Sequence, residues 1–187
     1  MAQKRKNWNG LISGFSASDL VFLDESGCNT DMTRRYAYSF GGSRAVDSAP
    51  LSKPKNTTIL SSIQLNGTLH YTTFSGGTTV ERFKRYLETD LLPHLNGNSV
   101  LVMDNMKSHH AKAVKNLLDS SGIRYIYLPP YSPDLNPIEK LWSKVKAFLR
   151  KFKARMLDAL PNAIQNAFHA VTVSDCSGWF RFCGYVL

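Results

Sequence analysis

A proline-rich turn that runs directly into an amphipathic helix constrains the fold of this chain more than any other stretch. It reads Pro129-Pro130-Tyr131-Ser132-Pro133-Asp134-Leu135-Asn136-Pro137-Ile138-Glu139. The prolines fix φ and exclude a regular strand or helix before Asn136. From Ile138 onward the apolar residues recur at helical spacing, at Leu141, Trp142, Val145, Phe148 and Leu149. The chain therefore turns here and begins a helix whose first turn carries the carboxylate of Glu139.

Two interpretations of Glu139 are open from this stretch alone. Asn136 is a favourable N-cap and Pro137 a favourable first helical residue. Asn136 and Glu139 thus resemble a capping box, in which the Glu side chain accepts a hydrogen bond from the backbone N–H of the cap. In the other interpretation the carboxylate is held at the helix start for chemistry. Partners elsewhere in the chain decide between the two.

Two short apolar runs are each followed by an aspartate. Residues 20–23 form a buried-type strand that stops at Asp24 and Glu25, and residues 99–103 form another that stops at Asp104. Ligand sites gather at the carboxyl ends of such strands. Because adjacent strand residues point to opposite faces, only one of Asp24 and Glu25 can face a given site.

Neighbouring strands would bring Asp24, Asp104 and Glu139 to one edge of the sheet. Three carboxylates repel one another at neutral pH unless cations neutralise them. An oxygen-only ligand set suits Mg²⁺ or Mn²⁺, and two such ions can clamp an in-line phosphoryl displacement.

The order of the remaining patterns predicts an α/β fold. Residues 36–40 could form a further strand before Gly41 and Gly42, and Asn66-Gly67 predicts a hairpin between residues 57–65 and 68–73. Helical patterns at residues 80–91 and 111–118 then alternate with strands, and helical spacing continues beyond Arg155. This order predicts a mixed sheet with helices packed on it.

Composition limits the class of partner and compartment. The 187 residues suit one domain with an appended helical tail, and 23 Lys and Arg against 14 Asp and Glu give a net charge of +9. Such a charge favours a polyanion, with nucleic acid first. No apolar run is long enough to span a membrane. Three cysteines without a paired spacing, Cys28, Cys176 and Cys183, are typical of a reducing cytoplasm, and DNA binding there would associate the protein with the nucleoid.

Several motifs together resemble the catalytic domain of the mariner superfamily of transposases, most closely its bacterial insertion-sequence branch. The similarity lies in Val102-Met103-Asp104-Asn105, in His109, and in residues 130–139, with 34 residues between Asp104 and Glu139 as in that family. The segment from Phe22 to Gly27 resembles the one that holds the first acid. Gly178-Trp179-Phe180 and Cys183-Gly184-Tyr185 are also similar, and the resemblance spans roughly residues 19–186.

The resemblance implies a ribonuclease H-like mixed sheet flanked by helices, with a helical C-terminal extension. It divides the chain into a basic N-terminal arm at 1–18, the DDE catalytic domain at 19–155 and the extension at 156–187. Asp24, Asp104 and Glu139 would bind two Mg²⁺ or Mn²⁺ ions for DNA cleavage and strand transfer. Asn105 would orient Asp104 or simply end the strand, while His109 would contact phosphate or the surroundings of Glu139, or serve only as a helix N-terminal residue.

A run of basic residues follows Glu139, with no acid between Lys140 and Arg155. Such a run is often only a solvated helix face. Beside a phosphodiester site it predicts contacts with the DNA backbone, and we assign these contacts to Lys140, Lys144, Lys146, Arg150 and Lys151.

The resemblance also sets expectations about partners. Full-length members of the superfamily carry helix-turn-helix modules before the catalytic domain, whereas about eighteen residues precede the first predicted strand here. We therefore expect transposon-end and target DNA as partners, a homodimer, and a separate helix-turn-helix protein from an upstream reading frame. The alternatives are an inactive DNA-binding remnant or regulator, and a ribonuclease H-like nuclease or resolvase.

Overall fold

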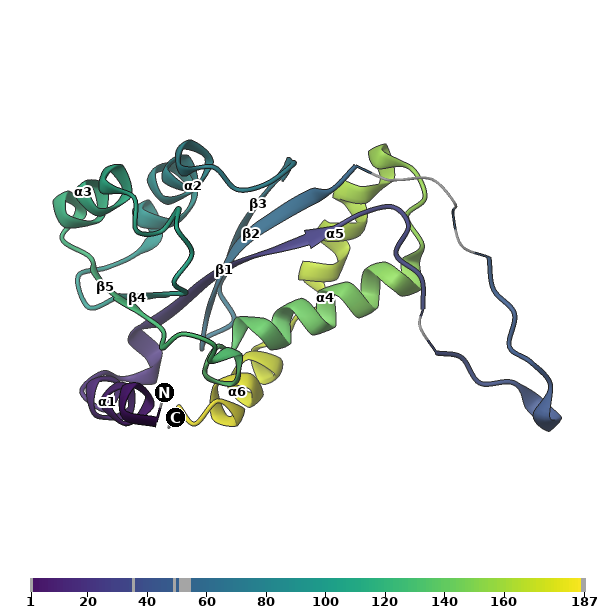
Figure 1. The fold of residues 1–187 in the computed structure, drawn as a ribbon, viewed down its shortest axis with the longest axis horizontal. Coiled ribbons are helices and arrows are strands. Elements are labelled where there is room, and N and C mark those ends of the chain that lie inside the picture. Colours follow the sequence, from purple (N-terminus) through teal and green to yellow (C-terminus); the bar gives the residue numbers. More distant parts are fainter. Residues whose placement is uncertain (1, 35, 49, 51–54, 186–187) are drawn as a thin grey trace.

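A five-stranded mixed sheet forms the centre of the molecule (Figure 1). The computed structural model describes residues 2–34, 36–48, 50 and 55–185, so residues 1, 186 and 187 of the predicted arm and extension lie outside the described part. The strand order is β3-β2-β1-β4-β5. The pairs β1–β2 and β2–β3 are antiparallel, and β1–β4 and β4–β5 are parallel. The strands are β1 (Leu20–Cys28), β2 (Thr57–Gln64), β3 (Leu69–Ser75), β4 (Val100–Met103) and β5 (Arg124–Tyr127).

Helices cover both faces of this sheet (Figure 1). Leu20 and Phe22 of β1 point into a core shared with α4 (Ile138–Phe152), α5 (Leu160–His169) and α6 (Val173–Phe182). Val21 and Leu23 point into a second core, shared with α2 (Val80–Tyr86) and α3 (Lys112–Ser121). The mixed sheet flanked by helices is confirmed, and β1 and β4 are neighbours. Residues that alternate along β1 thus belong to opposite layers.

Local sequence signals explain where several helices begin and end. Thr79 accepts a hydrogen bond from the backbone N–H of Arg82 and caps α2. The chain then continues through a π-helical turn at Leu87–Leu91 and a 3₁₀ turn at Leu92–His94. Gly122, with φ of 70°, ends α3. Thr172 and Asp175 form a reciprocal capping box at the start of α6.

The first strand is longer than predicted. We expected it to stop at Asp24, but β1 continues to Cys28 because β2 pairs with it along its whole second half, from Asp24 opposite Ser61 to Cys28 opposite Thr57. Backbone hydrogen bonds to β2 thus keep these polar residues in a strand, although they have little strand propensity of their own. Asp24 consequently lies within a strand rather than in a loop, opposite Ser61 of β2, while the pairing of β1 with β4 ends one residue earlier, at Leu23.

The segment at residues 36–40 does not form the strand that its aromatic residues suggested. Tyr36 and Tyr38 are exposed outside regular structure, and Phe40–Gly42 is a 3₁₀ turn. The described residues between β1 and β2 extend away from the body beyond the far end of α4 (Figure 1). Lys153 pairs with Asp47 there, and Arg155 donates to the carbonyls of Thr30 and Met32.

The chain ends also pack against the body. We expected residues 1–18 to be an exposed arm, but Ala2–Ile12 forms helix α1 and Trp8 is 3% exposed in the main core. Arg5 of this helix pairs with Asp134 of the proline-rich turn. Tyr185, near the other end, donates from its hydroxyl to the carbonyl of Leu135.

Within the described residues, no helix is long and apolar enough to cross a membrane.

Candidate active site

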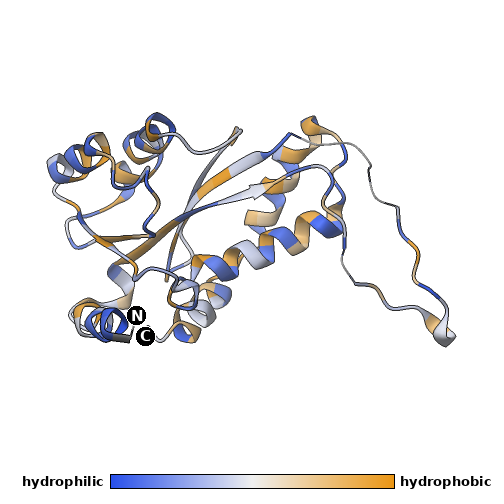
Figure 2. Cartoon of the chain, in the orientation of Figure 1, coloured by the Kyte–Doolittle hydropathy of each residue, from blue (hydrophilic) through white to orange (hydrophobic). Residues whose placement is uncertain are grey.

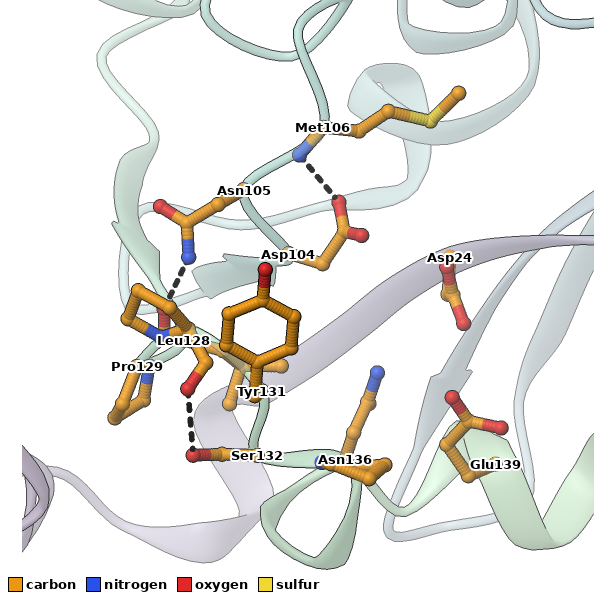
Figure 3. A pocket seen from close by; sticks show the side chains of 12 residues that line it. Asp24, Asp104, Asn105, Met106, Leu128, Pro129, Tyr131, Ser132, Asn136 and Glu139 are labelled. Carbon is orange, nitrogen blue, oxygen red and sulfur yellow. Dashed lines mark hydrogen bonds between the residues drawn. The ribbon is translucent and has the colours of Figure 1, made fainter. Parts of the chain in front are cut away.

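Three carboxylates from three separate elements line one cavity of about 470 Å³ (Figure 3). Asp24 comes from β1, on the face that packs against α4. Asp104 follows the last residue of β4, and Glu139 lies in the first turn of α4. The proline-rich turn supplies the opposite wall, with Pro129, Pro130, Tyr131, Ser132, Pro133 and Asn136 among its residues. The sequence analysis expected the three acids to lie at one edge of the sheet; Asp104 does follow a strand end and Glu139 a helix start, but Asp24 lies within β1.

Asp24 is the most buried of the three acids. Burial raises the pKa of Asp24 to about 7, and the negative charges of Asp104 and Glu139 add to that rise. Opposing it, the indole Nε1 of Trp142 donates to Asp24 Oδ2 at 3.1 Å. The sequence indicated Trp142 only as a core residue. Trp142 lies three residues after Glu139, and residues three apart are neighbours on the surface of a helix. This spacing was the signal in the sequence that Trp142 could contact the site.

Asp104 is fixed by two donors that follow it in the chain. Its Oδ1 accepts from the backbone N–H of Met106 at 2.9 Å and lies 2.8 Å from Nδ1 of His109. Burial raises the pKa of Asp104, but these two hydrogen bonds outweigh it, so the pKa lies below its ordinary value. The side chain of Asn105 turns the other way and donates to the carbonyl of Leu128, which joins this loop to the segment after β5.

His109 pairs with two carboxylates, one of which, Asp104, lines the same cavity as Glu139. It lies between Asp104 and Glu25, with Nε2 3.2 Å from Glu25 Oε2. Burial lowers the pKa of His109, but the hydrogen bonds that its ring donates to both carboxylates prevail and raise the pKa to about 9. Glu25, the neighbour of Asp24 that faces away from the cavity, is therefore paired with this histidine.

Glu139 does not cap its own helix. The backbone N–H of Asn136 donates to the carbonyl of Pro133 at 3.1 Å, so the partner that a capping box requires is already engaged. Pro137 is the N-cap and makes no side-chain hydrogen bond. The side chain of Glu139 is exposed and lines the cavity beside Asp24 (Figure 3). The capping-box interpretation is therefore wrong, and the cap is Pro137, one residue later than the predicted Asn136, while the turn and the helical spacing from Ile138 are confirmed.

The basic residues of α4 divide into two groups. Lys140 lies over the ring of Phe182 at 3.8 Å, and Lys144 pairs with Asp175 at 2.5 Å. On a helix with about 100° per residue, Lys146 and Arg150 instead share the face of Glu139. Figure 2 shows hydrophilic and hydrophobic residues alternating along α4, as expected for a helix with one buried face. Lys151 is exposed on the same side of the helix as Lys140 and Lys144.

The donor types around the cavity suit a hard divalent cation. Asp24, Asp104 and Glu139 offer only oxygen, which Mg²⁺ and Mn²⁺ prefer. A cation there would also offset the mutual repulsion that raises the pKa of Asp24. In the described part of the chain, no three His, Cys, Asp or Glu side chains already form a cluster that could hold an ion. The residue types therefore fit the metal, although the three carboxylates line the cavity without converging on one point.

Residues 19–160 match the DDE superfamily endonuclease family. The chain belongs to this family. The matched residues include Asp24, Asp104 and Glu139, and they contain the strands of both parallel pairs, β1–β4 and β4–β5. The Tc1 transposase of Caenorhabditis elegans is 29% identical over 97 residues, which are 50% of this chain and 36% of the relative. The Tcb2 transposase of Caenorhabditis briggsae is 31% identical over 75 residues, 40% of this chain and 28% of the relative.

Solved structures of Mos1 transposase share the fold of this DDE domain. A Mos1 paired-end complex with the left transposon end has a TM-score of 0.80 at 19% identity, over 95% of this chain and 57% of that one. The Mos1 catalytic domain alone gives a TM-score of 0.68 at 17% identity, over 96% and 85% of the two chains. The ribonuclease H-like fold is thereby confirmed. The matched regions amount to about a third of the length of the two Caenorhabditis relatives.

Proposed function

We propose that this chain is the catalytic domain of a DNA transposase, which cleaves a DNA strand and transfers it with the help of divalent metal ions. The observation that carries the proposal is that Asp24, Asp104 and Glu139, from β1, β4 and α4, line one cavity within a DDE endonuclease domain. The similarity to the Tc1 and Tcb2 transposases supports DNA as the substrate.

Asp24, Asp104 and Glu139 would hold two Mg²⁺ or Mn²⁺ ions. Bound ions of this kind activate a water molecule as the nucleophile and stabilise the charge on the leaving oxygen of a phosphodiester. Mos1 complexes solved with Mn and with Mg support this choice of metal. The chain's own contribution is orientation, because Trp142 holds one oxygen of Asp24, and Met106 and His109 hold one oxygen of Asp104.

The basic face of α4 would guide the DNA backbone to this cavity. Lys146 and Arg150 share a helix face with Glu139, so a strand that follows this face reaches the acids. Lys151, Lys140 and Lys144 lie to one side of it, and the contacts of Lys140 and Lys144 with α6 make them weaker candidates. Contacts of this kind are independent of DNA sequence and weaken with salt.

We also infer the branch and the partners. The motifs around Asp104, Glu139 and Tyr185 favour the bacterial insertion-sequence branch of the mariner superfamily. Recognition of the transposon ends would then come from a separate helix-turn-helix protein, and a homodimer would hold two ends, as the Mos1 paired-end complexes suggest. Such a protein would associate with the nucleoid. The genomic DNA beside the gene tests this inference, because it should contain an upstream reading frame for that protein and flanking inverted repeats.

Metal-dependent nicking of a supercoiled plasmid that carries the element's ends tests the proposed activity. We expect the wild-type chain to nick this plasmid with Mn²⁺ or Mg²⁺ and not with EDTA. Glu139→Gln should lower the rate at least about 100-fold, since the residue would serve the reacting centre directly. Glu81→Gln is the matched control, because Glu81 is also an exposed glutamate in the first turn of a helix, α2.

Two results would count against the assignment. Nicking by Glu139→Gln at the wild-type rate would remove Glu139 from the active site. Plasmid binding by a folded wild-type chain with no nicking under any divalent ion would favour the inactive DNA-binding regulator instead.

A further inference from the structure

Glu25 lies on the opposite face of β1 from Asp24, in the layer formed by α2 and α3. Only 13% of its side chain is exposed, and its Oε2 is 3.2 Å from Nε2 of His109. A carboxylate buried to this degree is costly unless donors compensate it. Its partner here is the same histidine that contacts Asp104.

His109 is held from three directions. It is fully buried, and its ring stacks on Phe83 with a centroid distance of 4.2 Å and an angle of 28° between planes. Its Nδ1 is 2.8 Å from Oδ1 of Asp104, and its backbone N–H donates to the carbonyl of Met106. With Phe83 on one side and Glu25 at Nε2, the ring has little freedom to rotate away from Asp104.

Asp104 needs such support because it lies outside regular structure. It follows the last residue of β4, and 44% of its side chain is exposed toward the cavity. Two donors on Oδ1 orient the carboxylate (Figure 3 shows the Met106 bond). Partners that orient a metal-binding carboxylate affect metal affinity, and a group that fixes such a partner supports the same geometry indirectly.

We propose that Glu25 is a positioning residue for Asp104, which it orients through His109 across the edge of the sheet. This inference rests on the proposed function, because it assigns Asp104 to the metal site. The two adjacent acids of β1 then have different tasks: Asp24 faces the cavity, and Glu25 supports the second acid from behind. The contact, rather than the charge of Glu25 alone, is what the proposal requires.

Binding of Mn²⁺ to the full chain, followed by the electron paramagnetic resonance signal of free Mn²⁺, tests this positioning. Glu25→Ala removes the contact with His109, and we expect about tenfold weaker binding, the lower end of what such supporting contacts contribute. Glu25→Gln keeps the length of the side chain and an oxygen that accepts from Nε2, so it should stay within about threefold of wild type. Glu88→Ala is the control, since this exposed glutamate of the π-helical turn pairs with Lys84, away from His109 and Asp104.

A double-substitution cycle shows whether the effect passes through His109. In His109→Asn the amide still reaches toward Asp104 but no longer reaches Glu25. Adding Glu25→Ala to that background should therefore change the affinity by no more than about twofold. Circular dichroism checks that each variant is folded, and Glu25→Asp, whose shorter side chain also loses the contact, replaces Glu25→Ala if that variant does not fold.

Three outcomes would overturn the inference while the proposed function stands. They are wild-type Mn²⁺ affinity in Glu25→Ala, a loss in Glu25→Gln as large as that in Glu25→Ala, and an undiminished effect of Glu25→Ala in the His109→Asn background. If Glu25→Gln lost as much affinity as Glu25→Ala, the role of Glu25 would be purely electrostatic. If Glu25→Ala had its full effect in the His109→Asn background, Glu25 would act on the metal site through Asp24 and the strand instead of through His109. A wild-type chain that neither binds Mn²⁺ nor nicks DNA would instead refute the proposed function and this inference with it.

Discussion

At the scale of single residues, the three acids are held in different ways. Asp24 is fixed by the pairing of β1 with β2 and by Trp142. Asp104 depends on the loop that follows it, through Met106 and His109. Glu139 is exposed and held only by the start of α4. Burial acts on Asp24 in two ways, because it restricts the side chain and raises its pKa by disfavouring the charge.

Tyr131 offers a test of strain at the rim of the cavity. Its φ of 55° is left-handed, which is unfavourable for a residue with a side chain, and its ring is 89% exposed. We expect Tyr131→Gly to raise the free energy of unfolding by about 1 kcal/mol, because the relief of strain exceeds the entropy cost of glycine. The same change should slow nicking, since an exposed ring at this rim is suited to stacking on a DNA base.

Urea unfolding of Tyr131→Gly and Tyr131→Phe measures this strain. Tyr131→Phe keeps the side chain and the strained backbone, so its stability should match wild type. A glycine variant less stable than the phenylalanine variant would show that the left-handed conformation is not under strain.

At the scale of elements, the sequence predicted those whose signals are local. Asn66-Gly67 correctly placed the β2–β3 hairpin, and the spacing after Ile138 correctly placed α4. The second half of β1 was missed because its polar residues become a strand only through pairing with β2, which begins 29 residues later along the chain. The strand predicted at residues 36–40 from its aromatic residues is wrong for the opposite reason. The composition favours a strand, but no neighbouring strand pairs with this segment.

The face of α4 that carries Glu139 leads to a prediction about DNA binding. Removing two charges with Lys146→Gln and Arg150→Gln should weaken binding to duplex DNA at every sequence. If each residue neutralises one phosphate, the slope of log affinity against log salt should fall in magnitude by about 1.8. Fluorescence anisotropy over a range of salt concentrations measures both quantities.

Lys112→Gln with Lys115→Gln provides the matched control on α3, which covers the other face of the sheet. It removes the same charge from the protein. An equal loss of slope in the control pair would mean that net charge, rather than the face of α4, governs DNA binding.

At the scale of the whole molecule, both ends of the described chain reinforce the proline-rich turn. Arg5 of α1 pairs with Asp134, and the hydroxyl of Tyr185 donates to the carbonyl of Leu135. The sequence could not predict these contacts, because 129 residues separate Arg5 from Asp134 and nothing in either segment specifies the other. The sequence did place Asp104 directly after a strand and Glu139 in the first turn of a helix, since these are local features. Contacts between distant segments, such as Glu25 with His109, required the fold.

The most direct test of the central claim is anomalous diffraction from crystals of the chain soaked with Mn²⁺. We expect anomalous peaks in the cavity of Figure 3, with oxygen ligands from Asp24, Asp104 and Glu139. Because the carboxylates do not converge here, we also expect binding to draw Glu139 and Asp104 toward Asp24. Peaks located elsewhere, or none in the cavity at a Mn²⁺ concentration that supports nicking, would refute the assignment of these three acids to the metal site.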